Sequence, residues 1–245
     1  MTPTAAAAPT AGPRTVRTPA GQAKDKILAT AFRLFYAHGL RAAGIDTIIA
    51  ESGVAKATFY KYFPAKDDLI LAYLEQVDGV WSGQLHAAAE AAGPDPAAQL
   101  VGLFDALSTA CRRDGYRGCA FINAAAESAS GTRVHERTVT HKQQVLAWIR
   151  DLAHQAGAPD PDGLARSLTL LLDGGLASGV LDADPAAAAA ARATAAQLVA
   201  AALTNPPTPQ LTDSCCRFEP SERQQLRASW ADTRRGALDR RPAPH

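Results

Sequence analysis

The feature that most constrains the fold of this chain is the spacing of its apolar residues, which recur every three to four positions from about residue 24 to residue 203. In the first segment Ile27, Ala31 and Phe35 follow one another at intervals of four, which places them on one face of a helix. Alanine, which favours helix, recurs throughout the chain. No segment shows the alternation of a half-buried strand. The pattern predicts an all-α protein.

Glycine and proline divide the pattern into separate helices. Gly39, Gly53 and Pro64 interrupt it early, and the run from Gly93 to Pro96 marks a clear break, after which a second apolar core is expected. Helices are expected over residues 24–39, 45–52, 56–63 and 67–92 before this break. After it, they are expected over residues 97–113, 116–128, 134–156, 162–181 and 185–203.

Charge and cysteine content limit the classes of function. The net charge is only +1, so a nucleic-acid partner would have to be recognised by a local group of cations. The four cysteines, Cys111, Cys119, Cys215 and Cys216, have neither metal-ligand spacing nor the density of a disulfide scaffold. The N-terminal segment lacks the apolar stretch of a signal peptide, and no membrane span is expected. We therefore expect a cytoplasmic protein without a membrane partner.

A short helix, a glycine-containing turn and a second short helix are predicted over residues 45–63. Helix-turn-helix proteins present the second of two such helices to the major groove of DNA. On that second helix Phe59 and Phe63 fall on one face with Val54, while lysines and hydroxyl-bearing side chains fall largely on the other. Those groups can bond phosphate oxygens, although an ordinary solvated helix could have the same composition.

The stretch from Gly39 to Leu69, including the turn Ser52-Gly53-Val54 and the helix KATFYKYF (residues 56–63), resembles the signature of the TetR/AcrR family of transcriptional regulators. The resemblance is specific over about residues 24–75. It implies a homodimer that binds palindromic double-stranded operator DNA, acts as a repressor and is released by a small-molecule inducer. By this resemblance Lys56 and Ala57 would face base edges, Thr58, Tyr60 and Tyr62 would hold phosphates, Lys66 would add a phosphate contact, and Lys61 would contact base or backbone.

Four positions depart from the family pattern. Ala43 and Gly44 stand where Thr and Ser are common, so a hydroxyl cap and a phosphate contact are missing. Tyr62 replaces a frequent His, and Ala65 stands where a Ser, Asn or Gly cap is usual before the fourth helix. These changes affect individual contacts and leave the helix pattern intact.

The resemblance and the helix pattern together divide the chain into four parts. We expect a disordered arm over residues 1–22, a helix-turn-helix domain over residues 23–66, a helical ligand-binding and dimerisation domain over residues 67–204, and a disordered tail over residues 205–245. The arm carries Arg14 and Arg17, which could touch DNA phosphates or remain solvated.

The second domain holds aromatic and polar side chains that could line a ligand cavity, or could fill the core instead. The candidates are Trp81, Phe104, Tyr116, Phe121, Asn123, Trp148 and Asp173. The inducer is a small molecule whose identity the sequence does not indicate. We expect no cofactor, no metal site and no catalytic residues.

Three alternative hypotheses concern cysteine and histidine. A thiol redox sensor would use Cys111 and Cys119, although packing of two small apolar residues is the favoured explanation. A helical enzyme would use Cys119 with His141, but no oxyanion-forming loop is recognisable. A metal site from His135, Glu136 and His141 has little support, because the two histidines do not share a helix face.

The expected homodimer would form through the helices at residues 162–181 and 185–203, which carry much apolar surface. Pairing them with the same helices of a second copy would make a four-helix interface about a two-fold axis. The side chains assigned to this interface are Leu164, Leu168, Leu171, Leu172, Leu176, Leu198, Val199 and Leu203.

Overall fold

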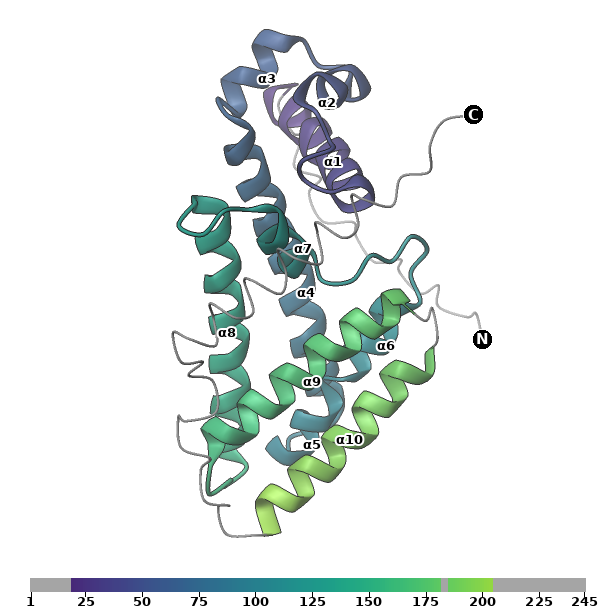
Figure 1. The fold of residues 1–245 in the computed structure, drawn as a ribbon, viewed down its shortest axis with the longest axis vertical. Helices are drawn as coiled ribbons and strands as arrows, with labels where there is room; N and C mark the ends of the chain where they lie inside the picture. The colour runs from purple at the N-terminus through teal and green to yellow at the C-terminus, as the bar shows by residue number, and fades with distance from the viewer. Residues whose placement is uncertain (1–18, 182–184, 205–245) are drawn as a thin grey trace, which may run out of the picture. The chain divides into compact units, whose positions relative to one another are not determined.

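The computed structural model describes residues 19–181 and 185–204, and within these ranges every regular element is a helix (Figure 1). The fold class predicted from the sequence is confirmed. The helices are α1 (Pro19–His38), α2 (Ile45–Ser52), α3 (Lys56–Tyr62), α4 (Lys66–Ala91), α5 (Pro96–Gly102), α6 (Asp105–Cys111), α7 (Ala120–Glu127), α8 (Arg133–Gln155), α9 (Pro161–Leu181) and α10 (Pro185–Thr204).

Several expectations fall on residues outside the described ranges. They include Arg14 and Arg17, the tail at residues 205–245, and the adjacent Cys215 and Cys216. The first helix begins at Pro19, inside the segment expected to be an arm, so the helical part of the chain starts earlier than the apolar periodicity indicates.

The first three helices pack around an apolar core that α4 and α7 complete. Ile27 of α1, Ile48 of α2 and Phe59 of α3 are fully buried in it, together with Phe121 of α7. Gly53, between α2 and α3, has a φ of 65°, the left-handed conformation expected for this sharp turn. The helix-turn-helix therefore rests directly on elements that follow it in the sequence.

The long helix α4 takes part in both apolar cores. Leu74 is buried with the first three helices, and Leu85, three turns further on, is buried with α5, α8 and α9. Helix α8 runs beside α4 in the same direction (Figure 1). A guanidinium nitrogen of Arg133 lies 2.9 Å from a carboxylate oxygen of Asp68, so polar pairs as well as apolar contacts connect the two helices.

Two of the expected helices are divided in the structure. Residues 97–113 form α5 and α6, with Leu103 and Phe104 between them, both fully buried. The backbone N–H of Phe104 donates to the carbonyl of Val101, three residues earlier, which tightens the chain at this point. Residues 116–128 are helical only from Ala120, because Gly118 has a φ of 76° that no helix accommodates.

The leucines assigned to the dimer interface are mostly core residues of the subunit itself. Leu164, Leu168, Leu172 and Leu176 of α9 are at most 6% exposed, and Val199 of α10 is 4% exposed. They pack against α8, α5, α6 and each other's helices. That part of the assignment is wrong, because helix periodicity identifies an apolar face without showing which neighbour covers it.

Two stretches, α9 and the residues Ala186–Thr204 of α10, are long and apolar enough to cross a membrane by length and composition. Neither stretch was predicted from the sequence as a candidate span, and no membrane span is expected there. Each nevertheless buries one face against the second core, through Leu168 and Leu172 on α9 and Ala195 and Val199 on α10. That is the packing of core helices in a helical domain.

Candidate functional sites

Helix α3 presents one face to the core and another to solvent. Phe59 and Phe63 are buried and Val54 is half-buried, as the sequence predicts. On the opposite face Lys56, Ala57, Tyr60 and Lys61 are exposed. The ring of Tyr60 packs edge-on against Phe59 at a centroid distance of 5.4 Å. This contact holds the Tyr60 ring in one orientation on the exposed face of α3.

Three of the seven residues assigned to DNA are partly covered. Thr58, Tyr62 and Lys66 are half-buried. The ammonium group of Lys66 donates to the carbonyl of Arg41 at 3.4 Å, and burial lowers the pKa of Lys66 although Glu127 and Asp67 act in the opposite direction. The lysine at the start of α4 thus contacts the segment between α1 and α2 in this structure.

Two exposed ion pairs lie on the surface of the helix-turn-helix and connect α2 to its two neighbouring helices. The ammonium nitrogen of Lys56 lies 3.4 Å from a carboxylate oxygen of Asp46 on α2, and Arg33 of α1 pairs with Glu51 of α2. Exposed pairs of this kind contribute little to stability. Lys56 can therefore leave Asp46 for another anion at small cost.

The second candidate site is a pocket of about 260 Å³ lined by residues of α1, α4, α6, α7 and α9 and by the connection before α7. Three of the seven side chains assigned to the ligand lie on its wall: Trp81, Tyr116 and Phe121. Cys119 also lines it, and both Cys119 and Cys111 are free and half-buried.

The other four assigned side chains lie elsewhere. Phe104 is fully buried in the second core, and Trp148 packs against His86 with a centroid distance of 4.2 Å and the two rings tilted by 46°. Asn123 lines a separate pocket between α1 and α7, and Asp173 pairs with Lys142 beside a third pocket on α8 and α9. The structure therefore does not bring the seven side chains together. Residues far apart in the sequence line one cavity only if the orientation of each helix points its side chain into that cavity.

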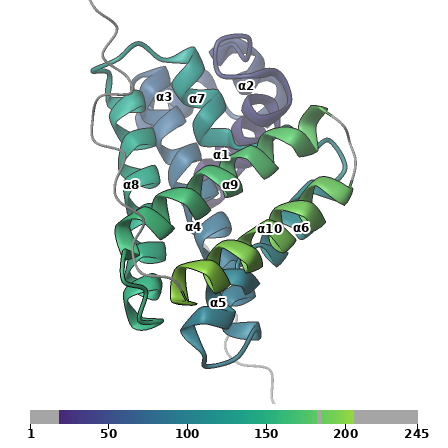
Figure 2. The ribbon, with the colours of Figure 1, turned by 60° about the horizontal axis from the view of Figure 1, so that its bottom comes forward.

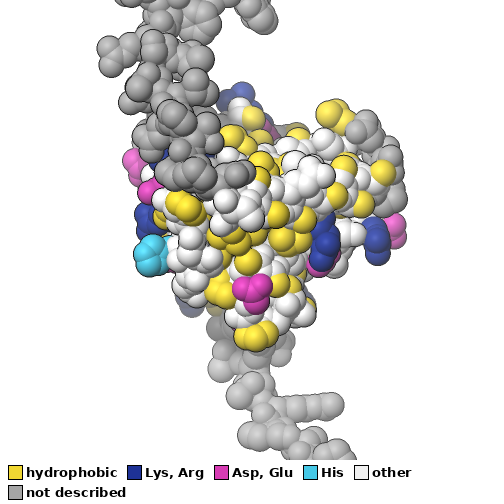
Figure 3. Space-filling model, turned by 90° about the horizontal axis from the view of Figure 1, so that it is seen from below, with side chains coloured by type: hydrophobic (Ala, Val, Ile, Leu, Met, Phe, Trp, Pro, Cys, Tyr) yellow, Lys and Arg dark blue, Asp and Glu magenta, His cyan; other side chains and the backbone are white. Residues whose placement is uncertain are grey.

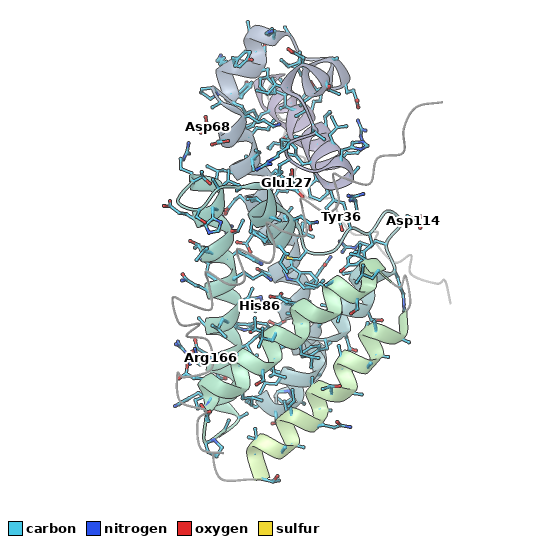
Figure 4. The ribbon with its side chains drawn as sticks, viewed as in Figure 1. Tyr36, Asp68, His86, Asp114, Glu127 and Arg166 are labelled. Atoms are coloured by element: carbon cyan, nitrogen blue, oxygen red, sulfur yellow. The ribbon has the colours of Figure 1, made fainter. Side chains whose placement is uncertain are left out.

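A hydrogen-bonded bridge connects the helix-turn-helix to the pocket wall, and sequence reasoning missed it. The hydroxyl of Tyr36 on α1 accepts from the backbone N–H of Arg117 at 3.0 Å and donates to the carbonyl of Gly118 at 3.4 Å. Further along, the backbone N–H of Arg41 donates to a carboxylate oxygen of Glu127 at 2.7 Å. Figure 4 labels Tyr36 and Glu127, which lie near each other where the first helices meet the segment that contains α7.

A buried polar cluster between α4 and α8 was also missed. Asp78 of α4 accepts from Nδ1 of His141 at 2.8 Å and pairs with Arg137, whose guanidinium group also lies 3.0 Å from Glu75. The ring of His141 stacks on Phe121 with a centroid distance of 3.6 Å. The cluster thereby adjoins a side chain of the pocket wall. The spacing of Arg137 and His141, four apart on α8, was its only signal in the sequence.

Burial sets the ionisation of this cluster. It lowers the pKa of His141, which is 1% exposed, and the neighbouring Asp78 offsets only part of that effect. Burial opposes the ionisation of Asp78, but hydrogen bonds from Arg137, Ser82 and His141 outweigh it and hold the pKa of Asp78 below its ordinary value. A neutral imidazole therefore donates from Nδ1 to an ionised carboxylate.

The sequence matches known regulators over the N-terminal segment. The profile of the family described as "Bacterial regulatory proteins, tetR family" matches residues 27–73, which contain α2 and α3. An uncharacterised HTH-type transcriptional regulator of Bacillus subtilis, YxaF, is 42% identical over 52 residues, 21% of this chain and 27% of that protein. The transcriptional activator FasR of Mycolicibacterium smegmatis is 37% identical over 68 residues, 27% of this chain and 31% of that protein. The matches to curated relatives span about a fifth to a half of those proteins.

Solved structures match over a greater length. SCO4454, a TetR-family regulator from Streptomyces coelicolor, is 38% identical and superimposes with a TM-score of 0.66. The aligned region covers 74% of this chain and 94% of that one. A TetR-type regulator from Streptomyces avermitilis is 25% identical, with a TM-score of 0.66 that covers 74% of this chain and 97% of that one. The helix-turn-helix lies within the matched family profile, and the match to SCO4454, at 38% identity, covers 94% of that protein. The chain therefore belongs to the TetR family of transcriptional regulators.

Proposed function

We propose that this protein is a transcriptional repressor that binds a palindromic operator as a homodimer and is released when a small molecule enters the pocket of about 260 Å³. The observation that carries the proposal is the exposed face of α3. Lys56, Tyr60 and Lys61 stand outward on a helix anchored by the buried rings of Phe59 and Phe63. A short helix with cations and hydroxyls on its free face fits the major groove.

Within this proposal the exposed residues of α3 have different roles. Lys56 and Ala57, in the first turn, approach base edges, and Tyr60 holds a phosphate with its hydroxyl. Lys61 contacts base or backbone. Thr58, Tyr62 and Lys66 supply further phosphate contacts, for which Lys66 must exchange the carbonyl of Arg41 for a DNA oxygen.

The dimer forms through the outer faces of α9 and α10, not through the buried leucines. Leu170 and Leu181 of α9 are 74% and 83% exposed and share one helical stripe with Gly174 and Ala177. The outer face of α10 carries several alanines, including Ala189, Ala193 and Ala200, whose small side chains let another helix approach closely, although Gln197 lies on the same stripe. Figure 2 shows the two helices side by side at the front, and Figure 3 shows apolar side chains gathered on the lower face with few charges among them.

The test of this function begins with duplexes selected by the protein from a random pool. We expect a two-fold symmetric site, whose affinity is then measured by fluorescence anisotropy over a series of salt concentrations. The observed association constant should fall linearly with salt on logarithmic axes, by close to one unit of slope per phosphate neutralised. Enrichment of no sequence, or of a site without symmetry, would refute the proposal. A reporter gene behind the site distinguishes repression from the activation named for FasR.

A further inference from the structure

The wall of the pocket is mainly aromatic and aliphatic. Phe32 of α1, Val77 and Trp81 of α4, Phe121 of α7 and Leu176 of α9 all contribute. These side chains come from both apolar cores, so the pocket lies where the helix-turn-helix helix α1 meets the helices of the second core. A molecule bound here would contact α1 directly.

The volume of the pocket limits the size of its ligand. An apolar cavity of about 150 Å³ in another protein is large enough to bind benzene. A pocket of about 260 Å³ accordingly accommodates one or two fused rings with a small substituent. Flat rings also suit the wall, because Phe32, Trp81 and Phe121 offer faces and edges for aromatic packing.

The polar groups of the wall determine which functional group the ligand carries. The hydroxyl of Tyr116 donates to the carbonyl of Leu176 at 2.9 Å, and the hydroxyl of Tyr36 bridges Arg117 and Gly118. In contrast, the side-chain oxygen Oε1 of Gln84 is buried and has no hydrogen-bond partner within the described part of the chain. A buried acceptor without a donor is costly, and Gln84 lines the pocket, so this oxygen is the natural anchor for an N–H or O–H group once the amide turns toward a bound molecule.

The charged residues of the wall argue for a neutral ligand. Arg113 and Asp114, which carry opposite charges, are both exposed, and no other Lys, Arg, Asp or Glu is among the residues that line this pocket. An ion placed against Trp81 and Phe121 would lose its hydration without gaining a partner of opposite charge.

We propose that the pocket binds a small neutral aromatic molecule of one or two rings, such as a phenol, a naphthol or an indole, whose O–H or N–H group donates to Oε1 of Gln84. This assignment rests on the proposed function for its regulatory meaning, but binding itself does not depend on DNA. It names the chemical class of the inducer and the side chain that selects it.

The test compares 2-naphthol with 2-methoxynaphthalene by isothermal titration calorimetry on the full chain. The two probes share the ring system, and only the first can donate a hydrogen bond. We expect the parent protein to bind 2-naphthol about tenfold more tightly, because the methoxy compound leaves the Gln84 oxygen unpaired. In Gln84→Leu this preference should disappear while the methoxy compound still binds. Equal affinity of the parent for both probes, or binding of neither, would overturn the proposal.

Two controls keep the result interpretable. Val80→Trp places a large ring at an exposed position of the pocket wall, so it should abolish binding of both probes while circular dichroism remains that of the parent. If binding of 2-naphthol persists unchanged in Val80→Trp and in Gln84→Leu, the molecule binds elsewhere and the assignment is wrong.

A separate measurement addresses regulation. Saturating 2-naphthol should weaken binding of the selected operator by the parent at least fivefold and by Gln84→Leu much less. Failure to bind any operator would refute the proposed function, while the calorimetry still decides the pocket. If 2-naphthol binds without changing operator affinity, the claim that small neutral aromatic molecules act as inducers through this pocket is refuted.

Discussion

The outer face of α9 offers the sharpest test of the proposed dimer, through the substitution Leu170→Asp. Leu170 is 74% exposed in the subunit, and full burial of a leucine side chain contributes about 1.5 to 3 kcal/mol. Covering that exposed part is therefore worth roughly 1 to 2 kcal/mol per copy, or roughly 2 to 4 kcal/mol for the two copies of a symmetric interface. The dimer dissociation constant should rise between about thirtyfold and a thousandfold, and desolvation of the new carboxylate adds to this.

Sedimentation equilibrium over a range of concentrations measures this change directly. Gln144→Asp, at an exposed position on α8, is the matched control and should leave association unchanged. Leu168→Asp, only two residues from Leu170 but 0% exposed, should instead destabilise the subunit itself and lower its thermal midpoint. If Leu170→Asp associates as tightly as the parent, the interface does not include this face of α9.

Three further predictions follow from the two candidate sites. On α3, Tyr60→Phe should weaken the binding of operator and of unrelated DNA about equally, with an unchanged salt dependence, because a neutral hydroxyl is lost. Lys56→Ala should instead lose about 1 to 3 kcal/mol of preference for the operator in anisotropy titrations. If both variants bind DNA like the parent, the DNA-binding surface lies elsewhere. Tyr36→Phe removes the bridge to Arg117 and Gly118, so the factor by which saturating 2-naphthol weakens operator binding should shrink by more than calorimetry shows the affinity for 2-naphthol to change. An undiminished factor would exclude this bridge as the connection. In urea titrations the free energy of unfolding should fall as the pH falls below 6.5, the ordinary pKa of a histidine, because the unfolded chain takes up a proton that the buried imidazole of His141 resists. His141→Gln should show a weaker fall over the same pH range, and a fall as steep as that of the parent would contradict this prediction.

The sequence determined the local features of this protein. The stripe of Ile27, Ala31 and Phe35, the left-handed turn at Gly53 and the two faces of α3 could all be inferred from residues less than ten positions apart. Helix periodicity and turn chemistry depend on neighbours along the chain, so these inferences needed no knowledge of the tertiary structure. The helix-turn-helix and the exposed residues Lys56 and Tyr60 therefore appeared where they were expected.

Only the tertiary structure decided which surfaces meet. The leucine stripe of α9 is covered by the subunit's own helices, so the face left for a partner carries Leu170 and Leu181 instead. The pocket at Gln84 and the bridge from Tyr36 to Gly118 join positions more than thirty residues apart, and the breaks at Phe104 and Gly118 set how those helices approach. Periodicity marks an apolar face but not its neighbour, because that depends on how every helix is oriented once all the apolar faces compete for burial.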